Sequence, residues 1–267
     1  GLRREAVVLR TLNEAEHGKP EDRRRIIAVL DSGDLPSGLP FVIQELAPGK
    51  VFSPFEIESF VDERQMLAVA AAVAEAMALA HQHQLAFDDF EPNTKRDRIF
   101  LQWLSEGHDA FKMRIIDWNI TGGPEDIAQD LIYLGGYLYY LFTGEHLVLV
   151  DNKPNLDVLQ WRDAWQRLTL GTRQVIQRLL NLDSTGTYEQ AGAAYDDLTW
   201  WHGVMMSAET AAPALALQEA ITKARTLGRN ERVVAVADLV TRLEVSPYER
   251  AMFEKWADGA RQKLDQS

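Results

Sequence analysis

Two acidic positions in the middle of the chain carry the side chains best suited to chemistry. Asp117 ends the apolar run 111–116, and an acid at the end of an apolar strand is placed to hold a cation. Asp89 lies upstream, in a polar stretch that includes Asn93. Each acid also has a plainer interpretation, because Asp117 could cap the turn that follows it and Asp89 could cap its own loop. The residues alone leave metal-assisted chemistry and structural capping open.

The order of residues around these two acids is specific. The run from His81 to Pro92 reads H-Q-H-Q-L-A-F-D-D-F-E-P, and 113–119 reads M-R-I-I-D-W-N. Protein kinases carry L-H-x-x-G-I-V-H-R-D-x-K-P-x-N and then a strand that ends in D-F-G at a similar separation. The chain thus resembles the protein kinase-like superfamily. The resemblance implies that Asp89 stands at the catalytic base and Asp117 at the metal-holding aspartate. The metal-binding asparagine corresponds to Asn93 or Thr94, and the sequence leaves this register open.

The same resemblance exposes several losses. The motif His, Arg, Lys and Gly are replaced by Phe87, Asp88, Glu91 and Asn119. The family's Lys would hold the transferring phosphate, whereas Glu91 would repel it by about 1 kcal/mol or more at contact distance near a surface. No G-x-G-x-x-G phosphate loop and no V-A-I-K-like lysine occur in the sequence. The sequence therefore indicates a kinase-like fold more clearly than a working kinase.

A second relative shares part of the layout. Small-molecule kinases of the aminoglycoside phosphotransferase and choline kinase type carry H-G-D-x-x-x-x-N, then I-D-W-E, then D-L-A. Ile116-Asp117-Trp118 and Asp130-Leu131 resemble this order, whereas the helix that ends at Thr143-Gly144 resembles protein kinases. Asp130 follows Asp117 by only 13 positions, which leaves no room for a regulated activation loop. Both families share one fold, so the substrate class stays open.

The first 50 residues resemble the second half of a kinase small lobe. Residues 3–9 look like the start of the helix whose Glu pairs with the ATP-binding Lys, and Glu5 is the candidate. Because no such Lys precedes it, we expect Glu5 to be an exposed helix residue. Residues 44–49 resemble the hinge, and the resemblance places Glu45 and Leu46 at the border of the adenine pocket.

Hydrophobic periodicity predicts the elements that position these residues. We expect helices over 2–12, 62–83 and 126–142, strands over 26–30, 41–46, 99–103 and 111–116, and late helical regions over 172–188 and 191–200. The basic run 23–25 is interpreted as a solvated edge, and His81 as a packing residue.

The C-terminal residues resemble no part of a kinase and read as three helices, about 208–227, 230–243 and 247–264. The third has a strong start signal, because Ser246 can cap the helix, Pro247 suits its first position and Glu249 completes a capping box. Small residues on these helices suit close pairing, as in tetratricopeptide-type hairpins. Trp200-Trp201 are expected to pack the large lobe against them.

Composition limits the kinds of partner and the cellular location that we expect. The chain has 267 residues, a net charge of -12 and no cysteine. The acidic balance disfavours a nucleic-acid or anionic-membrane surface, because such binding needs a basic patch. The lack of cysteine fits a reducing cytoplasm, which is the expected location. No apolar run reaches 18 residues, so we expect no membrane contact.

Together these features predict an α+β, protein kinase-like fold with a truncated small lobe (1–50), a mainly helical large lobe (51–204) and a helical C-terminal extension (205–267). The leading hypothesis is a bacterial-type pseudokinase that binds a partner protein and needs no cofactor. One alternative is a divergent small-molecule phosphotransferase, with Asp89 as base and Asp117 and Asn93 on Mg²⁺. The other is a scaffold that binds Mg-ATP without turnover.

Overall fold

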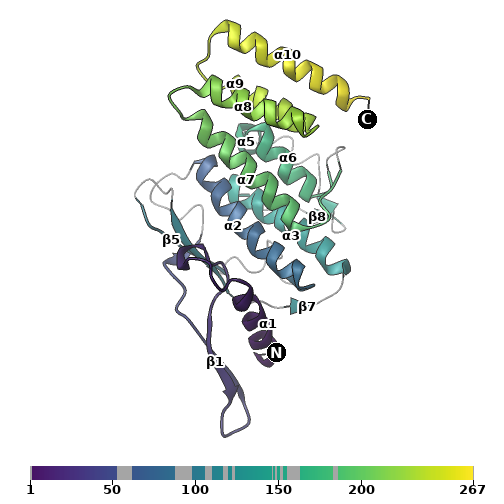
Figure 1. Ribbon diagram of the computed structural model, residues 1–267. Helices are drawn as coiled ribbons and strands as arrows, with labels where there is room; N and C mark the ends of the chain where they lie inside the picture. Colours follow the sequence, from purple (N-terminus) through teal and green to yellow (C-terminus); the bar gives the residue numbers. More distant parts are fainter. Residues whose placement is uncertain are drawn as a thin grey trace.

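The computed structural model shows an elongated molecule with small sheets at one end and stacked helices at the other (Figure 1). The residues that the structure describes are 2–52, 62–87, 98–105, 110–116, 120–121, 124–145, 147, 149–150, 153–154, 163–182 and 186–266.

Helix α1 (Leu2–Ala15) covers a hairpin of β1 (Val29–Asp34) and β2 (Pro40–Gln44). The helix forms because its apolar side chains recur at helical spacing, and Leu9 and Leu12 are fully buried as a result. The short 3-10 helix η1 (Glu21–Arg23) lies between α1 and β1.

A second sheet connects the small lobe to the helical body. It has the order β3 (Lys50–Val51), β5 (Ile99–Trp103), β6 (Phe111–Ile115), and all its pairs are antiparallel. Gly49, just before β3, has φ +69°, and a Cβ there would lie 2.1 Å from the carbonyl oxygen of Leu101. Glycine is therefore required where the chain leaves the hinge region.

Helix α2 (Glu63–Gln82) is the central element of the body and packs most extensively on α7 (Ala191–Ala208). Asp62 and Gln65 form a capping box at its start. Its many alanines allow neighbouring backbones to approach closely, and Leu67 and Met77 are fully buried there. The other elements of the body are β4 (Ala86–Phe87), β7 (Ile120–Thr121), α3 (Pro124–Thr143), β8 (Leu149–Val150), β9 (Lys153–Pro154), α5 (Asp163–Arg167) and α6 (Leu170–Leu179).

Three helices close the chain: α8 (Pro213–Thr226), α9 (Asn230–Val240) and α10 (Pro247–Leu264). They stack beyond α7, with α10 outermost (Figure 1). The expected capping box at Ser246 and Glu249 is present. One continuous hydrophobic core extends from α1 to α10.

The expected fold class, an α+β kinase-like arrangement with a reduced small lobe and a helical large lobe, is confirmed. The first two strands lie a few residues from their expected positions. Helix α7 continues to Ala208, so the expected boundary at 204/205 falls inside it. The interpretation of 23–25 as a solvated edge is wrong for Arg25, whose side chain is 12% exposed and pairs with Glu75.

Candidate functional site

The residues predicted to do chemistry lie beside one strand pair. Asp89 and Asn93 belong to 88–97 and Asp117 belongs to 117–119, and both stretches lie outside the described residues. The strands next to them are described, and Phe87 on β4 lies opposite Ile120 on β7 in an antiparallel pair. The pairing therefore places the residue just before 88–97 next to the residue just after 117–119.

The strand that leads to Asp117 is anchored on both sides. The N–H of Ile115 donates to the carbonyl of Arg25 at 2.8 Å, and the N–H of Ile27 donates back to the carbonyl of Ile115. The N–H of Ile116 donates to the carbonyl of Arg98 at 2.9 Å. These bonds fix the end of β6 against the small lobe. No sequence pattern indicated the contact with residues 25–27.

A buried polar pair joins α2 to α3. His81, near the end of α2, has its Nε2 2.9 Å from Oδ2 of Asp130 on α3. Their side chains are 4% and 1% exposed. The pair connects the helix before the predicted catalytic loop to the helix after Asp117. His81 thus has the packing position that the sequence indicated, and Asp130 acts as its partner.

The expected hinge residues have different environments. The carboxylate of Glu45 accepts from Nε of the buried Arg114 at 2.5 Å and from the N–H of Ala28 at 3.1 Å. Arg114 also donates to the carbonyls of Arg24 and Glu21. Glu45 therefore connects β2 to β6.

Leu46 and Glu5 are the other small-lobe positions that the sequence indicates. Leu46 is 95% exposed. Glu5 lies half-buried on α1, rather than fully exposed as expected.

A carboxylate cluster that the sequence did not reveal joins the small lobe to α2. Glu16 is buried and accepts from the backbone N–H groups of Arg25 and Ile26. Lys19 donates to Glu75 on α2 at 2.8 Å. Burial alone would lower the pKa of Lys19, but the hydrogen bond to Glu75 and the nearby charges outweigh burial and raise that pKa. The cluster therefore holds the two lobes together.

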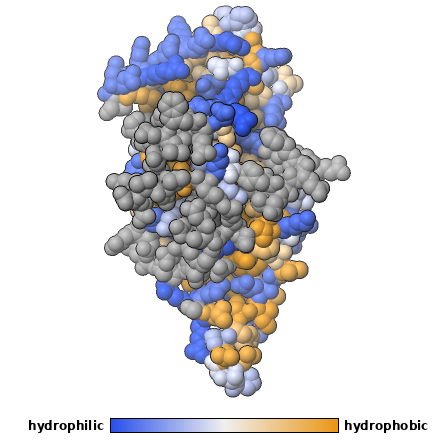
Figure 2. All heavy atoms as spheres, turned by 180° about the vertical axis from the view of Figure 1, so that it is seen from behind, coloured by the Kyte–Doolittle hydropathy of each residue, from blue (hydrophilic) through white to orange (hydrophobic). Residues whose placement is uncertain are grey.

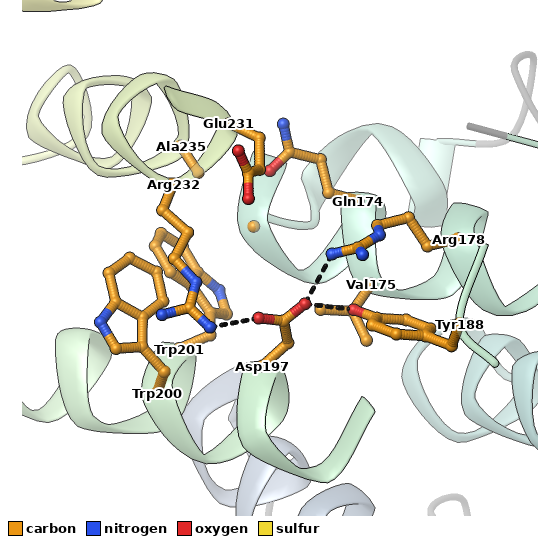
Figure 3. A pocket seen from close by; sticks show the side chains of 11 residues that line it. Gln174, Val175, Arg178, Tyr188, Asp197, Trp200, Trp201, Glu231, Arg232 and Ala235 are labelled. Atoms are coloured by element: carbon orange, nitrogen blue, oxygen red, sulfur yellow. Dashed lines mark hydrogen bonds and ion pairs between the residues drawn. The ribbon is translucent and has the colours of Figure 1, made fainter. Parts of the chain in front are cut away.

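A second polar cluster, the Asp197 junction, joins the large lobe to the C-terminal helices (Figure 3). The carboxylate of Asp197 on α7 accepts from Arg178 on α6 at 2.7 Å and from the hydroxyl of Tyr188 at 2.6 Å. Its other oxygen accepts from Arg232 on α9. Burial and the charge of Asp197 together raise the pKa of Tyr188, which stays protonated as a donor.

The cavity at the Asp197 junction is too small for a substrate. Its volume is about 20 Å³, room for about one water molecule. The guanidinium of Arg178 stacks on the Tyr188 ring at 4.2 Å, and that of Arg232 stacks on the Trp200 ring at 4.6 Å. The junction is therefore a structural contact. Trp200 and Trp201 lie at it beside residues of α9, as expected for residues that pack the large lobe against the C-terminal helices.

The described part of the chain lacks two kinds of feature. No group of three or more His, Asp or Glu side chains there could hold a metal ion. No helix there is long and apolar enough to cross a membrane.

Comparison with known proteins gives the fold. No protein-family model matches the chain, and no curated protein matches it. The structure is similar to the crystal structure of Rad53 1-466 in complex with AMP-PNP, with a TM-score of 0.50 and 17% identity. The match covers 71% of this chain and 53% of the Rad53 chain, about half of its length. At this identity the likeness shows the fold alone, and that fold is protein kinase-like.

Proposed function

We propose that this chain is a catalytically inactive kinase-like module, a pseudokinase of bacterial type, that acts in the cytoplasm as a scaffold for a protein partner. One combination of observations supports the proposal. The β4–β7 pair and the buried His81–Asp130 pair keep a kinase-like frame. The residues that the sequence places on this frame, Phe87, Asp88 and Glu91, are not those that phosphoryl transfer uses.

The hinge supports the same conclusion. Because Arg114 and the N–H of Ala28 engage the carboxylate of Glu45, this side chain has a structural use. Leu46 points its side chain to solvent. Under this proposal the Glu45 side chain therefore has a role in small-lobe packing, and no nucleotide contact is assigned to the side chain of Leu46.

The first experiment is thermal unfolding with and without millimolar ATP and Mg²⁺. A ligand at about 100 times its dissociation constant stabilises a fold by about 2.7 kcal/mol, which is a shift of a few degrees for a chain of this size. We expect no shift. A metal-dependent shift that Asp117→Ala abolishes would favour the nucleotide-binding scaffold instead.

The second candidate is a divergent small-molecule phosphotransferase. Ile116-Asp117-Trp118 and Asp130-Leu131 favour it, because they follow the small-molecule kinase order. Asp89 would be the base, and Asp117 and Asn93 would hold Mg²⁺, in a fold that also binds AMP-PNP in Rad53. Transfer of phosphate from ATP above the level of an Asp89→Ala, Asp117→Ala double variant would establish this activity and overturn the scaffold proposal.

A further inference from the structure

The C-terminal helices contain a groove of about 680 Å³ that the kinase-like fold does not explain. It lies between the end of α8, the start of α9 and the second half of α10. Its volume is in the range of ordinary ligand sites. Its lining residues are Thr222, Arg225, Thr226, Gly228, Asn230, Val233, Lys255, Trp256, Gly259, Ala260 and Lys263.

The charged side chains that line this groove are all basic. Arg225, Lys255 and Lys263 line it, and no described acidic residue does. The whole chain has a net charge of -12, and residues 205–267 carry nine acidic and nine basic side chains. The groove is thus a local concentration of positive charge on an acidic protein. Figure 2 shows that the end formed by the C-terminal helices is largely hydrophilic.

The three cations are available to a ligand. Nearby arginines pair within the helices, since Arg261 bonds Asp258 at 2.9 Å and Arg229 lies 3.8 Å from Glu231. Among the described residues, Arg225, Lys255 and Lys263 form no ion pair, and all three are exposed. The guanidinium of Arg225 lies 6.0 Å from the ring of the half-buried Trp256, which places charge beside an aromatic face.

The spacing along α10 sets the size of the ligand. Lys255, Gly259 and Lys263 recur every four residues and share one face of the helix, over a length of about 12 Å. That length fits about four residues of an extended peptide. Gly259 lies between the two lysines, and a Cβ there meets no described atom within 4 Å. Its missing side chain keeps the middle of the groove open beside Trp256.

We propose that this groove binds an extended acidic segment of a partner protein. Two carboxylates about four residues apart meet Lys255 and Lys263, and an apolar side chain between them lies on Trp256. Nucleic acid suits the groove less well, because duplex or single-strand binding needs a longer basic track than three cations, and the rest of the molecule is acidic. The groove lies far along the chain from the nucleotide positions, so its binding does not depend on them.

The test uses fluorescence anisotropy with the whole chain and rhodamine-labelled octapeptides. Each peptide has two glutamates separated by two, three or four residues, one central leucine and serine elsewhere. We expect saturable binding that is tightest for three intervening residues, that weakens as salt is raised, and that is at least about tenfold weaker when both glutamates are glutamine. Absence of saturable binding by every peptide would overturn the proposal.

Matched variants localise the binding. Lys255→Glu, Lys263→Glu is expected to weaken binding at least about tenfold, whereas Arg250→Glu, Arg261→Glu makes the same charge change on exposed residues of α10 outside the groove and should leave binding within about twofold. If both double variants weakened binding equally, the attraction would be non-specific, and the assignment of the binding site to the groove would be overturned.

Gly259 provides a variant that should not unfold the protein. Gly259→Glu fills the groove with an acid, and Gly259→Ala adds only a methyl group, while both favour the helix. We expect Gly259→Glu to abolish peptide binding with an unchanged or higher unfolding midpoint, and Gly259→Ala to retain it. Tighter binding of a single-stranded oligonucleotide than of any peptide, with the same sensitivity to Gly259→Glu, would overturn the assignment to acidic peptides. If the chain proved to catalyse phosphate transfer from ATP, the scaffold proposal would fail, but the expected peptide-binding results would stay the same.

Discussion

At the scale of single residues, Asp197 joins three segments of the molecule, because its carboxylate accepts hydrogen bonds from Arg178, Tyr188 and Arg232. It pairs with Arg178 and Arg232, whose side chains are 15% and 14% exposed. Asp197→Ala would leave both guanidinium groups desolvated without their anion. We expect the free energy of unfolding to fall by about 2 kcal/mol or more, measured by urea denaturation.

Asp197→Asn is the matched control, because it removes the charge and keeps one acceptor oxygen. Its cost should be smaller than that of Asp197→Ala. A loss of less than about 0.5 kcal/mol for the alanine variant would contradict the structural role of the junction.

Gly171, at the start of α6, makes a second residue-level prediction. A Cβ there would lie 2.2 Å from the buried indole of Trp201. We expect Gly171→Ala to destabilise the fold by about 1–3 kcal/mol, because the new methyl group overlaps the buried ring and forces it to shift. Gly203→Ala, on α7, meets no described atom within 4 Å and should be neutral or stabilising. Chemical denaturation of the two variants, side by side, measures the difference.

The sequence predicted some of these residues and could not predict others. His81 was interpreted as a packing residue because its motif position implied one, and it is buried against Asp130. Glu16 and Asp197 gave no signal, because their main partners lie in other segments: backbone N–H groups of residues 25–26 for Glu16 and two arginines for Asp197. Spacing along the chain does not reveal such partners. The roles of Asp89, Asn93 and Asp117 stay predictions.

At the scale of elements, the start of α10 gives a pH-dependent prediction. The hydrogen bonds from Ser246 lower the pKa of Glu249 from its ordinary value of 4.5. A lowered pKa in the folded state adds stability above the unfolded pKa, and this stability is lost as pH falls through the folded pKa. We therefore expect Glu249→Ala to lower the unfolding midpoint at neutral pH, and the difference from the natural chain to shrink below pH 4.5.

The control for this prediction is Glu254→Ala, which removes an exposed acid from the middle of the same helix. Thermal unfolding of both variants across the pH range separates the cap from a general charge effect. A difference for Glu249→Ala that stays constant with pH would contradict the contribution of the charged cap.

The elements themselves were largely predictable, and their ends were not. Apolar periodicity predicted a helix over 62–83, and α2 spans Glu63–Gln82, within one residue at each end. Helix α6 stops at Leu179, and Asn181 shortly after it takes φ +59°. Helix α7 continues to Ala208 because Val204 is buried in the core that the C-terminal helices share. Such ends depend on tertiary contacts, which local patterns do not contain.

At the scale of the whole molecule, the two ends differ in surface character. The hairpin end exposes apolar side chains, and Figure 2 shows them gathered at the narrow tip of the molecule. They are Leu30, Leu35, Leu39 and Ile43. The opposite end carries the basic groove. The continuous core and the Asp197 junction connect the apolar hairpin end to the basic groove. A partner bound at the groove is therefore held at a defined position relative to the hairpin.

This continuity predicts that the C-terminal helices are needed by the large lobe. Helices α8 and α9 pack on α7 and α6, and Leu217 and Ile221 are fully buried. A chain that ends at Ala208 would expose their partners on α7, lose Arg232 from the Asp197 junction, and forfeit about 1.5–3 kcal/mol for each large apolar side chain left uncovered. We expect a lower unfolding midpoint and self-association, measured by light scattering after gel filtration. A chain that ends at Val245 lacks only α10 and should lose less. A shortened chain ending at Ala208 that stays monomeric with an unchanged midpoint would instead make the C-terminal helices an independent unit.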